Sequence, residues 1–344
     1  MPSRTKEQLE NIWIKKLMSH IGKGKDKLSQ NSLKLYAQRI RRVWKIMYPD
    51  KAFKGKTFLH REVKKIIKAI NDDDMAMSSK AGIYSAIVST YHENAKGIQG
   101  NGREMYSKQL KIWAEKVKKI EKKQVVNKKQ DDRWISKEET EEARKNLLEK
   151  AEKSKKLLDY RDYVMFSLFT LLPPRRAADY GEMKISKNED KEGNVLVPRI
   201  KNGKKRFWKF VFNDFKLSEK KGSESFDRDF MENLPNGREI LELLDGWLLM
   251  NPKGYFLVTP RSNTHMSKAM SRLSKRVLKK PININIFRHM YISNFLDTNP
   301  FLLEKEMIST YMSHSVAQQE LYRKKIDEED LKGFEREAPN KVST

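Results

Sequence analysis

Side chains suited to chemistry on an anion stand, in the second half of this sequence, where the local pattern predicts apolar residues. The segment NIFRHMYISNFL (285–296) has mostly helical apolar spacing, yet it carries Arg288 and His289 near its start. An arginine so close to a core is costly unless an anion meets it. Arg288 therefore predicts an anionic ligand or substrate.

A second break in the apolar pattern follows an apolar helix. In LLPPRRAADYGEM (171–183) that helix ends at two prolines and runs straight into Arg175 and Arg176. Asp179 lies three residues after Arg176, where its carboxylate could hold that guanidinium in a fixed orientation. Such breaks are where function is expected.

Two more breaks in the apolar pattern lie before and after the segment 285–296, which carries Arg288. In STYMSHSVAQQELYRK (309–324), His314 interrupts a helix boundary, and Tyr322 follows eight residues later on what should be another short helix. Upstream, FNDFKLSEKKG (212–222) supplies Lys216 just after a predicted strand. In chain order the set reads Arg, Lys, Arg, His, Tyr.

The elements that must position these residues are mainly helices with one small sheet. Ser136 followed by Glu139 is a capping box that predicts a helix start. YRDYVMFSLFTLL (160–172) is almost wholly apolar and predicts a helix at the centre of a core. NVLVPRI and RFWKFVFN, on either side of Asn202-Gly203, predict a β-hairpin with a type I′ turn.

The first third of the chain predicts helices only, over residues 32–48, 62–71, 78–94 and 105–123. In the first of these, Lys34, Arg41 and Lys45 lie on a different face from the apolar residues. Such a stripe is either a solvated surface or a phosphate-contacting face. The charged stretch 116–132 then predicts the end of a helix and an interdomain linker.

The amino-acid composition of the chain limits the kind of partner that it is expected to bind. Of the 344 residues, 72 are lysine or arginine and 46 are acidic, which gives a formal net charge of +26 and a pI near 9.8. A polyanion is therefore the first partner to consider, and nucleic acid fits better than a membrane, because no apolar run of about 18 residues exists. With no cysteine and no metal-binding or phosphate-loop motif, we expect no metal and no cofactor.

The sequence from about Trp134 to Lys325 resembles the tyrosine recombinase/integrase family, which shares its catalytic domain with type IB topoisomerases. PPRRAADY, FVFNDFK and FRHMYISNFL look most like integrases of virophages and related DNA-virus or transposon elements. The resemblance implies an α+β fold that is mainly α with a small antiparallel sheet. It also implies a helical DNA-binding (core-binding) domain at 1–125, a linker at 126–133, a catalytic domain at 134–326 and a tail at 327–344.

The resemblance carries over residue by residue, with two departures. An acid three residues after the first arginine selects Arg176 over Arg175. The family's H-x-x-R-H motif is matched by NIFRH (285–289), with Asn285 in place of the first histidine. The resemblance implies that Asn285 and His289, together with Asp179, support the site. The gap from His314 to Tyr322 is one residue shorter than usual.

The family's chemistry implies a role for each residue. Arg176 and Arg288 would clamp the phosphate in the transition state, and His314 would hydrogen-bond the same phosphate. Lys216 would protonate the departing 5′ oxygen, and Tyr322 would be the nucleophile. Lys204, Lys205 and Lys209 are rivals for the lysine role, and Tyr311 is the nearby rival for the nucleophile.

The implied partner is double-stranded DNA, bound by a homotetramer during recombination, with no membrane involved. The expected DNA contacts are Lys34, Arg41, Lys45, Arg175, Lys204 and Lys205. The tail, with Leu331 and Phe334 as anchors, could link neighbouring subunits, or it is a frayed terminus. We expect an intracellular location where the DNA target is, either a host nucleus or the cytoplasm.

Two other functions remain open at this point. A type IB topoisomerase would use the same chemistry as a monomer and relax supercoils. A catalytically inactive relative would bind DNA with strong salt dependence and never become covalently attached.

Overall fold

The computed structural model describes residues 6–23, 28–91, 101–123, 131–189, 193–257 and 265–324. The chain divides into two compact units, Met1–Lys123 and Gln124–Thr344, and each is described by itself. Most of the predicted linker at 126–133 and the whole tail at 327–344 lie outside the described residues, as do Leu331 and Phe334.

Helices are the only regular secondary structure among the described residues of the first unit, as the apolar periodicity predicted. The hydroxyl of Ser29 caps the N-terminus of its second helix by accepting from the Ser32 amide, and the buried side chains of Ile40 and Trp44 lie on the inner face of that helix. Residues 92–94 of the predicted helix 78–94 lie outside the described part. The helices are α1 (Lys6–Ile21), α2 (Gln30–Met47), α3 (Phe58–Arg61), α4 (Val63–Asp72), α5 (Met77–Val88) and α6 (Gly102–Lys123).

The second unit combines helices with one five-stranded sheet, which confirms the α+β class. Its helices are α8 (Lys137–Ser154), α9 (Leu157–Leu171), α10 (Ala177–Gly181), α11 (Ser218–Lys221), α12 (Arg228–Glu232), α13 (Gly237–Met250), α14 (His265–Leu278), α15 (Ile284–Asp297), α16 (Leu302–Tyr311) and α17 (Val316–Tyr322). The predicted capping box forms at the start of α8, where Ser136 and Glu139 satisfy each other's backbone amides.

The sheet has the strand order β4-β3-β2-β1-β5. Its strands are β1 (Lys184–Ile185), β2 (Val195–Lys201), β3 (Lys204–Phe212), β4 (Glu224–Asp227) and β5 (Gly254–Tyr255). All neighbours are antiparallel except β1 and β2, so the sheet is mixed, whereas the expectation was an antiparallel sheet. A strand of two residues such as β1 leaves no alternating pattern, which is why the sequence did not reveal this parallel pair.

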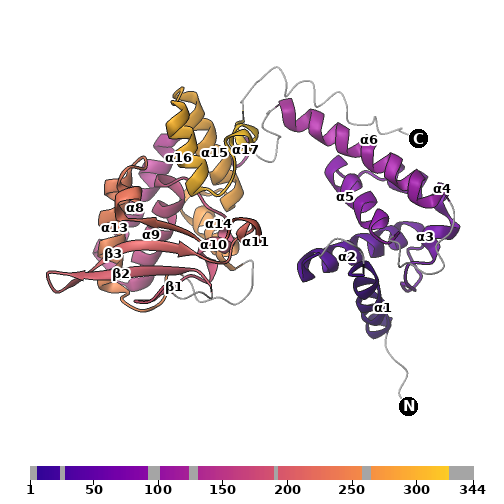
Figure 1. Cartoon of the computed structure of the whole chain (residues 1–344), viewed down its shortest axis with the longest axis horizontal. Helices are drawn as coiled ribbons and strands as arrows, with labels where there is room; N and C mark the ends of the chain where they lie inside the picture. Colours follow the sequence, from indigo (N-terminus) through magenta and orange to yellow (C-terminus); the bar gives the residue numbers. More distant parts are fainter. Residues whose placement is uncertain are drawn as a thin grey trace, which may run out of the picture. The chain divides into compact units, whose positions relative to one another are not determined.

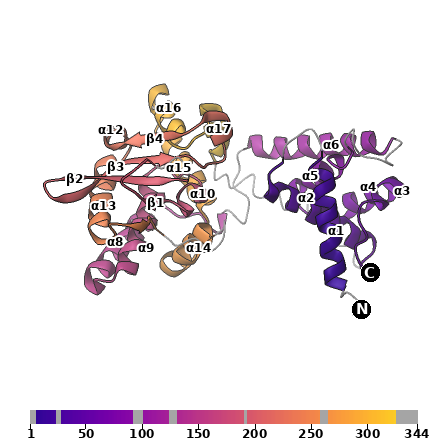
Figure 2. The same ribbon diagram turned by 60° about the horizontal axis from the view of Figure 1, so that its bottom comes forward.

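The predicted hairpin forms between β2 and β3. Asn202 and Gly203 both have positive φ, 52° and 71°, as a type I′ turn requires. The turn lies at the end of the sheet away from α10 and α11 (Figures 1 and 2). Side chains at this turn are therefore remote from the arginines that precede α10.

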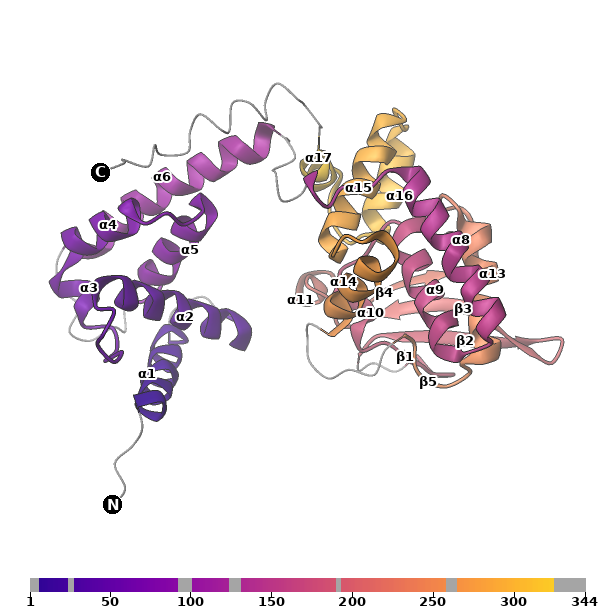
Figure 3. The same ribbon diagram turned by 180° about the vertical axis from the view of Figure 1, so that it is seen from behind.

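Helices α8, α9 and α13 lie together on one face of the sheet (Figures 1 and 3). From Asp162 to Leu171 every side chain of α9 except that of Thr170 is buried, which fits the apolar sequence there. Helix α15 packs against α9, where the rings of Phe166 and Phe287 meet edge to face at 5.8 Å. This packing brings Arg288, the next residue of α15, to the prolines that follow α9. Among the described residues, no helix combines the length and the apolar character needed to cross a bilayer.

Candidate active site

Arg288 is buried in the second turn of α15 and is only partly satisfied. Its exposed fraction is 2%, and its Nη1 donates to the carbonyl oxygen of Pro174. Its Nε and Nη2 are buried and have no protein acceptor. Burial lowers the pKa of the guanidinium, and nearby Tyr322 opposes that shift. Two N–H-bearing nitrogens thus remain for a ligand.

Tyr322 is the last residue of α17 and lies half-buried among the other candidates. Its ring is 5.0 Å from the centre of the Arg288 guanidinium, 5.0 Å from the ring of His289 and 5.7 Å from the ring of His314. His289 Nδ1 also lies 2.8 Å from the Tyr322 carbonyl oxygen. This contact holds the end of α17 against α15.

His314 lies on the turn between α16 and α17 and is 7% exposed. Its Nδ1 donates to the carbonyl oxygen of Ser315 at 3.1 Å, and its Nε2 is buried without a partner. Burial, together with the charges of Arg288, Arg176 and Lys221, lowers its pKa to about 4. His314 is therefore neutral at pH 7 and faces a group of cations.

Arg176 is the third cation near this point. It occupies the N-cap position of α10, it is half-buried, and its Nη1 is buried without a partner. Its charge lowers the pKa values of both Arg288 and His314, so it lies close to both. A buried polar atom left without a partner costs about 1–3 kcal/mol. Four such atoms, on Arg176, Arg288 and His314, are the arrangement expected where an anion is to bind.

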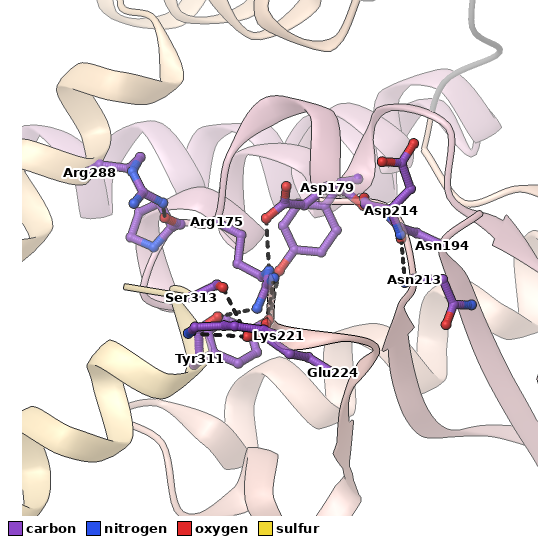
Figure 4. Close-up of polar contacts among 12 residues, drawn as sticks. Arg175, Asp179, Asn194, Asn213, Asp214, Lys221, Glu224, Arg288, Tyr311 and Ser313 are labelled. Carbon is purple, nitrogen blue, oxygen red and sulfur yellow. Dashed lines mark hydrogen bonds and ion pairs between the residues drawn. The ribbon is translucent and has the colours of Figure 1, made fainter. Parts of the chain in front are cut away.

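The neighbouring Arg175 is placed very differently. It is fully buried, with its guanidinium centre 3.9 Å from the ring of Phe212. Its Nε donates to Asp179 at 2.9 Å, its Nη2 to Glu224 at 3.0 Å and its Nη1 to the carbonyl oxygen of Tyr311 (Figure 4). Although burial acts to lower it, the pKa of Arg175 is raised by the negative charges around it.

These contacts correct two expectations. Asp179 pairs with Arg175 and not with Arg176, because Arg175 is the one that enters the core beside α10. Arg175 was also expected to contact DNA, but a guanidinium with no exposed surface and three protein acceptors has no face to offer a phosphate. The assignment of Arg176 to the site then depends on its own unpaired nitrogen and on its proximity to Arg288.

The lysine candidates are spread over both ends of the sheet. Lys204 is exposed at the β2–β3 turn, Lys205 donates to the Pro252 carbonyl oxygen at 2.8 Å, and Lys209 pairs with Glu189. Lys216 is exposed on the segment between β3 and α11, at the α10 end of the sheet. Among the described residues no hydrogen bond or ion pair joins Lys216 to the other candidates.

The segment that carries Lys216 is tied to α10 by one side chain. The Asn194 amide donates to the carbonyl oxygens of Asp179 and Asp214, and it accepts from the backbone amides of Asn213 and Asp214 (Figure 4). Asn194 is 6% exposed. This junction fixes the chain two residues before Lys216.

Sequence reasoning missed two residues at the site, Lys221 and Glu224. Lys221 lies close enough to His314 for its charge to lower the pKa of that imidazole. Its Nζ is 3.5 Å from a carboxylate oxygen of Glu224. The doubled lysine at 220–221 was a signal for the first. Glu224 stands in a short edge strand and carried no signal in the sequence.

Other candidates fall away from the cluster. Asn285 is exposed in the first turn of α15, and no hydrogen bond between described residues links it to Arg288. Tyr311 is fully buried, its hydroxyl lies 2.7 Å from that of Tyr180, and burial raises its pKa. A buried phenol of this kind is a poor nucleophile, so the geometry favours Tyr322 over Tyr311.

In the first unit, the expected DNA contacts on α2 separate into two kinds. Lys34 and Lys45 are exposed. Arg41 instead forms an ion pair with Glu10, whose side chain is only 7% exposed. Arg41 therefore balances a buried carboxylate between α1 and α2, while its own side chain remains 34% exposed, so a phosphate contact at Arg41 stays a prediction.

No group of three or more histidine, aspartate or glutamate side chains in the described part of the chain is arranged to hold a metal ion. At the site itself, the described residues bring together the cationic side chains of Arg176, Arg288 and Lys221, the imidazole of His314 and the ring of Tyr322.

No protein-family model and no curated protein matches this sequence. Among solved structures, the chain is similar to a crystal structure of XerA recombinase, with 13% sequence identity, a TM-score of 0.33, and coverage of 95% of this chain and 98% of that chain. It is also similar to XerH site-specific recombinase bound to difH substrate in a pre-cleavage complex, with 12% identity, a TM-score of 0.36, and coverage of 97% of each chain. At TM-scores below 0.5, these likenesses leave the chemistry to be argued from the site itself.

Proposed function

We propose that this protein is a site-specific DNA recombinase that cuts and rejoins DNA through a 3′-phosphotyrosine intermediate on Tyr322. One observation carries the proposal: Arg288 and His314, which lie beside the half-buried Tyr322, have buried nitrogens without protein partners, and so does Arg176, whose charge acts on both of them. A phosphodiester supplies both the anion that these groups lack and the phosphorus that a tyrosine can attack.

The proposed reaction exchanges one phosphoester bond for another. Tyr322 Oη loses its proton to water and bonds to phosphorus, while the bond from phosphorus to the 5′ oxygen breaks. A lysine ammonium, assigned to Lys216 from the sequence, gives a proton to the departing 5′ oxygen. The products are a 3′-phosphotyrosine and a free 5′-hydroxyl. Attack by another 5′-hydroxyl reverses the step, so no ATP is needed.

The transition state explains the two guanidiniums. Charge builds on the non-bridging oxygens as phosphorus becomes five-coordinate, and planar N–H donors held in a water-poor site stabilise it without reorganising. His314 is neutral while the site is empty. A bound phosphate offsets the positive charges that lower its pKa, so Nε2 can then take up a proton and donate to the phosphate.

The charge of the whole chain supports a duplex as substrate. A net charge of +26 favours binding to a polyanion, and exposed lysines such as Lys34 and Lys45 give the first unit phosphate contacts of its own. We further propose a homotetramer on DNA and an integration reaction of a mobile or viral element. These two points rest on the resemblance of PPRRAADY, FVFNDFK and FRHMYISNFL to integrases.

The test is covalent capture of DNA. The protein would be incubated with nicked suicide duplexes made from the ends of its own element and analysed on denaturing gels. We expect a DNA-linked protein band for the parent and for Tyr311→Phe, and none for Tyr322→Phe, because only the hydroxyl of Tyr322 reaches the phosphate.

Three results would overturn the proposal in different ways. DNA binding without any covalent band, over a fair range of sites, would identify a binding protein that has lost the reaction. A covalent band together with relaxed supercoils but no joined recombinant products would identify a topoisomerase. A band that survives Tyr322→Phe would move the nucleophile elsewhere.

A further inference from the structure

We infer that Glu224 is a positioning residue that holds two parts of this site, Lys221 and the Ser313–His314 turn, against the buried Arg175. The inference rests on the proposed function, since it concerns how the same phosphate site is assembled. Glu224 would not touch the DNA itself. It would act through the cation and the imidazole that do.

The carboxylate of Glu224 joins three elements. Its Oε2 accepts from Arg175 Nη2 at 3.0 Å, and its Oε1 accepts from Ser313 Oγ at 2.9 Å and lies 3.5 Å from Lys221 Nζ. Figure 4 shows Glu224 at the meeting point of these side chains. The side chain is 15% exposed, so these contacts are largely shielded from water.

Arg175 makes this carboxylate a fixed acceptor. The guanidinium is locked by Asp179, by the Tyr311 carbonyl oxygen and by stacking on Phe212, and it has no exposed surface. A carboxylate bound to an immobile arginine cannot rotate freely, since it would lose a charge-assisted hydrogen bond. Its second oxygen is therefore held at one place at the edge of the site.

Ser313 uses that oxygen to fix the turn that carries His314. Ser313 is fully buried and has φ of 52°, a left-handed conformation that a serine rarely adopts. Its amide donates to the carbonyl oxygen of Thr310, and the amide of His314 donates to the carbonyl oxygen of Ser309. These two hydrogen bonds close the turn that follows α16. The bond from Ser313 Oγ to Glu224 adds a tertiary anchor to this reversal. The reversal then aims His314 at Tyr322.

Lys221 uses the same oxygen to stay near the site. It is the last residue of the short helix α11, and its side chain is 40% exposed. A lysine side chain so exposed has many rotamers directed into water, and in each of them the ammonium lies away from the site. The carboxylate selects the rotamers near His314, whose pKa already responds to the charge of Lys221.

The experiment is a set of double-mutant cycles on the rate constant of covalent capture, measured at saturating protein with the suicide duplex. Glu224→Gln, Lys221→Ala and Ser313→Gly are each expected to slow capture by about 10- to 100-fold, as small misplacements of reacting groups do, with DNA affinity nearly unchanged. Ser313→Gly removes the hydroxyl but tolerates the positive φ. Lys220→Ala, an exposed neighbour on α11, is the matched control and should not change the rate.

Non-additivity separates positioning from general loss of structure. If Glu224 acts through Lys221, the double variant Glu224→Gln/Lys221→Ala is no slower than Glu224→Gln alone, whereas independent effects would multiply. The same holds for Glu224→Gln/Ser313→Gly. Multiplied effects in both cycles would overturn the inference.

Two further outcomes are decisive. If Glu224→Gln fails to fold because Arg175 loses a partner, Lys221→Ala and Ser313→Gly still decide, since both leave the Arg175–Glu224 pair intact. Parental rates in both of them would overturn the inference. If the parent protein itself forms no covalent band, the proposed function fails and this inference fails with it. A parental band with unaffected variants removes the inference alone.

Discussion

Two arginines are buried in the second unit of this chain, and their surroundings are opposite. Arg175 is fully enclosed and balanced by two carboxylates, Asp179 and Glu224. Arg288 is equally enclosed, but its protein acceptor is the carbonyl oxygen of Pro174, and two of its nitrogens have none. The pKa of Arg175 is raised by its neighbours, while burial lowers that of Arg288.

The difference separates an arginine that is paired within the fold from one that is only partly satisfied by it. Burying a charge is costly unless it is paired, and Arg175 is paired within the protein. Arg288 is held in place by the packing of α15 on α9, and no carboxylate of the described residues forms an ion pair with it. Burial alone therefore does not identify a functional arginine. The count of acceptors around it does.

The largest expected effect breaks the first half of the comparison. Arg175→Met leaves Asp179 and Glu224 as buried carboxylates without their partner, so we expect the free energy of unfolding of the second unit to fall by about 3–5 kcal/mol. Urea unfolding followed by near-ultraviolet circular dichroism would measure it. Arg288→Met is the matched control and should cost far less, because it removes an unpaired charge. Equal losses for the two variants would show that Arg288 is also balanced within the fold.

The next effect tests the second half. Arg288→Met should lower the rate constant of covalent capture by about 10²- to 10³-fold, the loss typical of removing one donor to a developing oxyanion. Arg272→Met, which removes an exposed arginine from α14, controls for the loss of one positive charge. Capture on the suicide duplex at saturating protein gives both rates. A similar small decrease in the two variants would mean that Arg288 attracts DNA only through its charge.

The sequence predicted the elements of the fold well because their signals are local. The capping box at Ser136, the type I′ turn at Asn202-Gly203 and the apolar helix after residue 156 each depend on a few adjacent residues. Arg288 could also be chosen from its place in an apolar segment, whereas His314 and Tyr322 were chosen because the ordered set Arg, Lys, Arg, His, Tyr resembles that of a known family. The structure brings these three together around one point.

What the sequence could not show depends on long-range contacts. Arg175 and Arg176 are adjacent and identical in type, and only the packing against Phe212 and the carboxylates decides which one is buried. Glu224 is 89 residues from Ser313 along the chain, so no spacing rule links them. The sequence also could not show that Lys221, rather than Lys216, has its ammonium near His314. Lys221 is held there by the carboxylate of Glu224 in β4, and no short sequence motif reveals such a contact.

The smallest effect is a pH dependence at His314. The pKa of a histidine in the unfolded chain is about 6.5, and in the folded protein burial and nearby charges lower that of His314 to about 4. Between these pH values the unfolded chain binds more protons, so this group's contribution to stability is present above pH 6.5 and is lost as the pH falls toward 4. The groups whose charges act on it are Arg288 from α15, Arg176 before α10 and Lys221 from α11.

An anion in the site should reverse part of this shift. Sulfate stays a dianion over this pH range, so it offsets the three positive charges and raises the pKa of His314, and by linkage it binds more tightly as the pH falls, by up to about tenfold per pH unit. Titration of the His314 ring protons by NMR, with and without sulfate, would measure the change. The same titration on Arg288→Gln is the control, since the paired Arg175 remains but the unpaired donors are gone. A sulfate-induced shift that persists in this variant would mean that the anion binds elsewhere, and that the unpaired nitrogens of Arg288 do not mark the phosphate site.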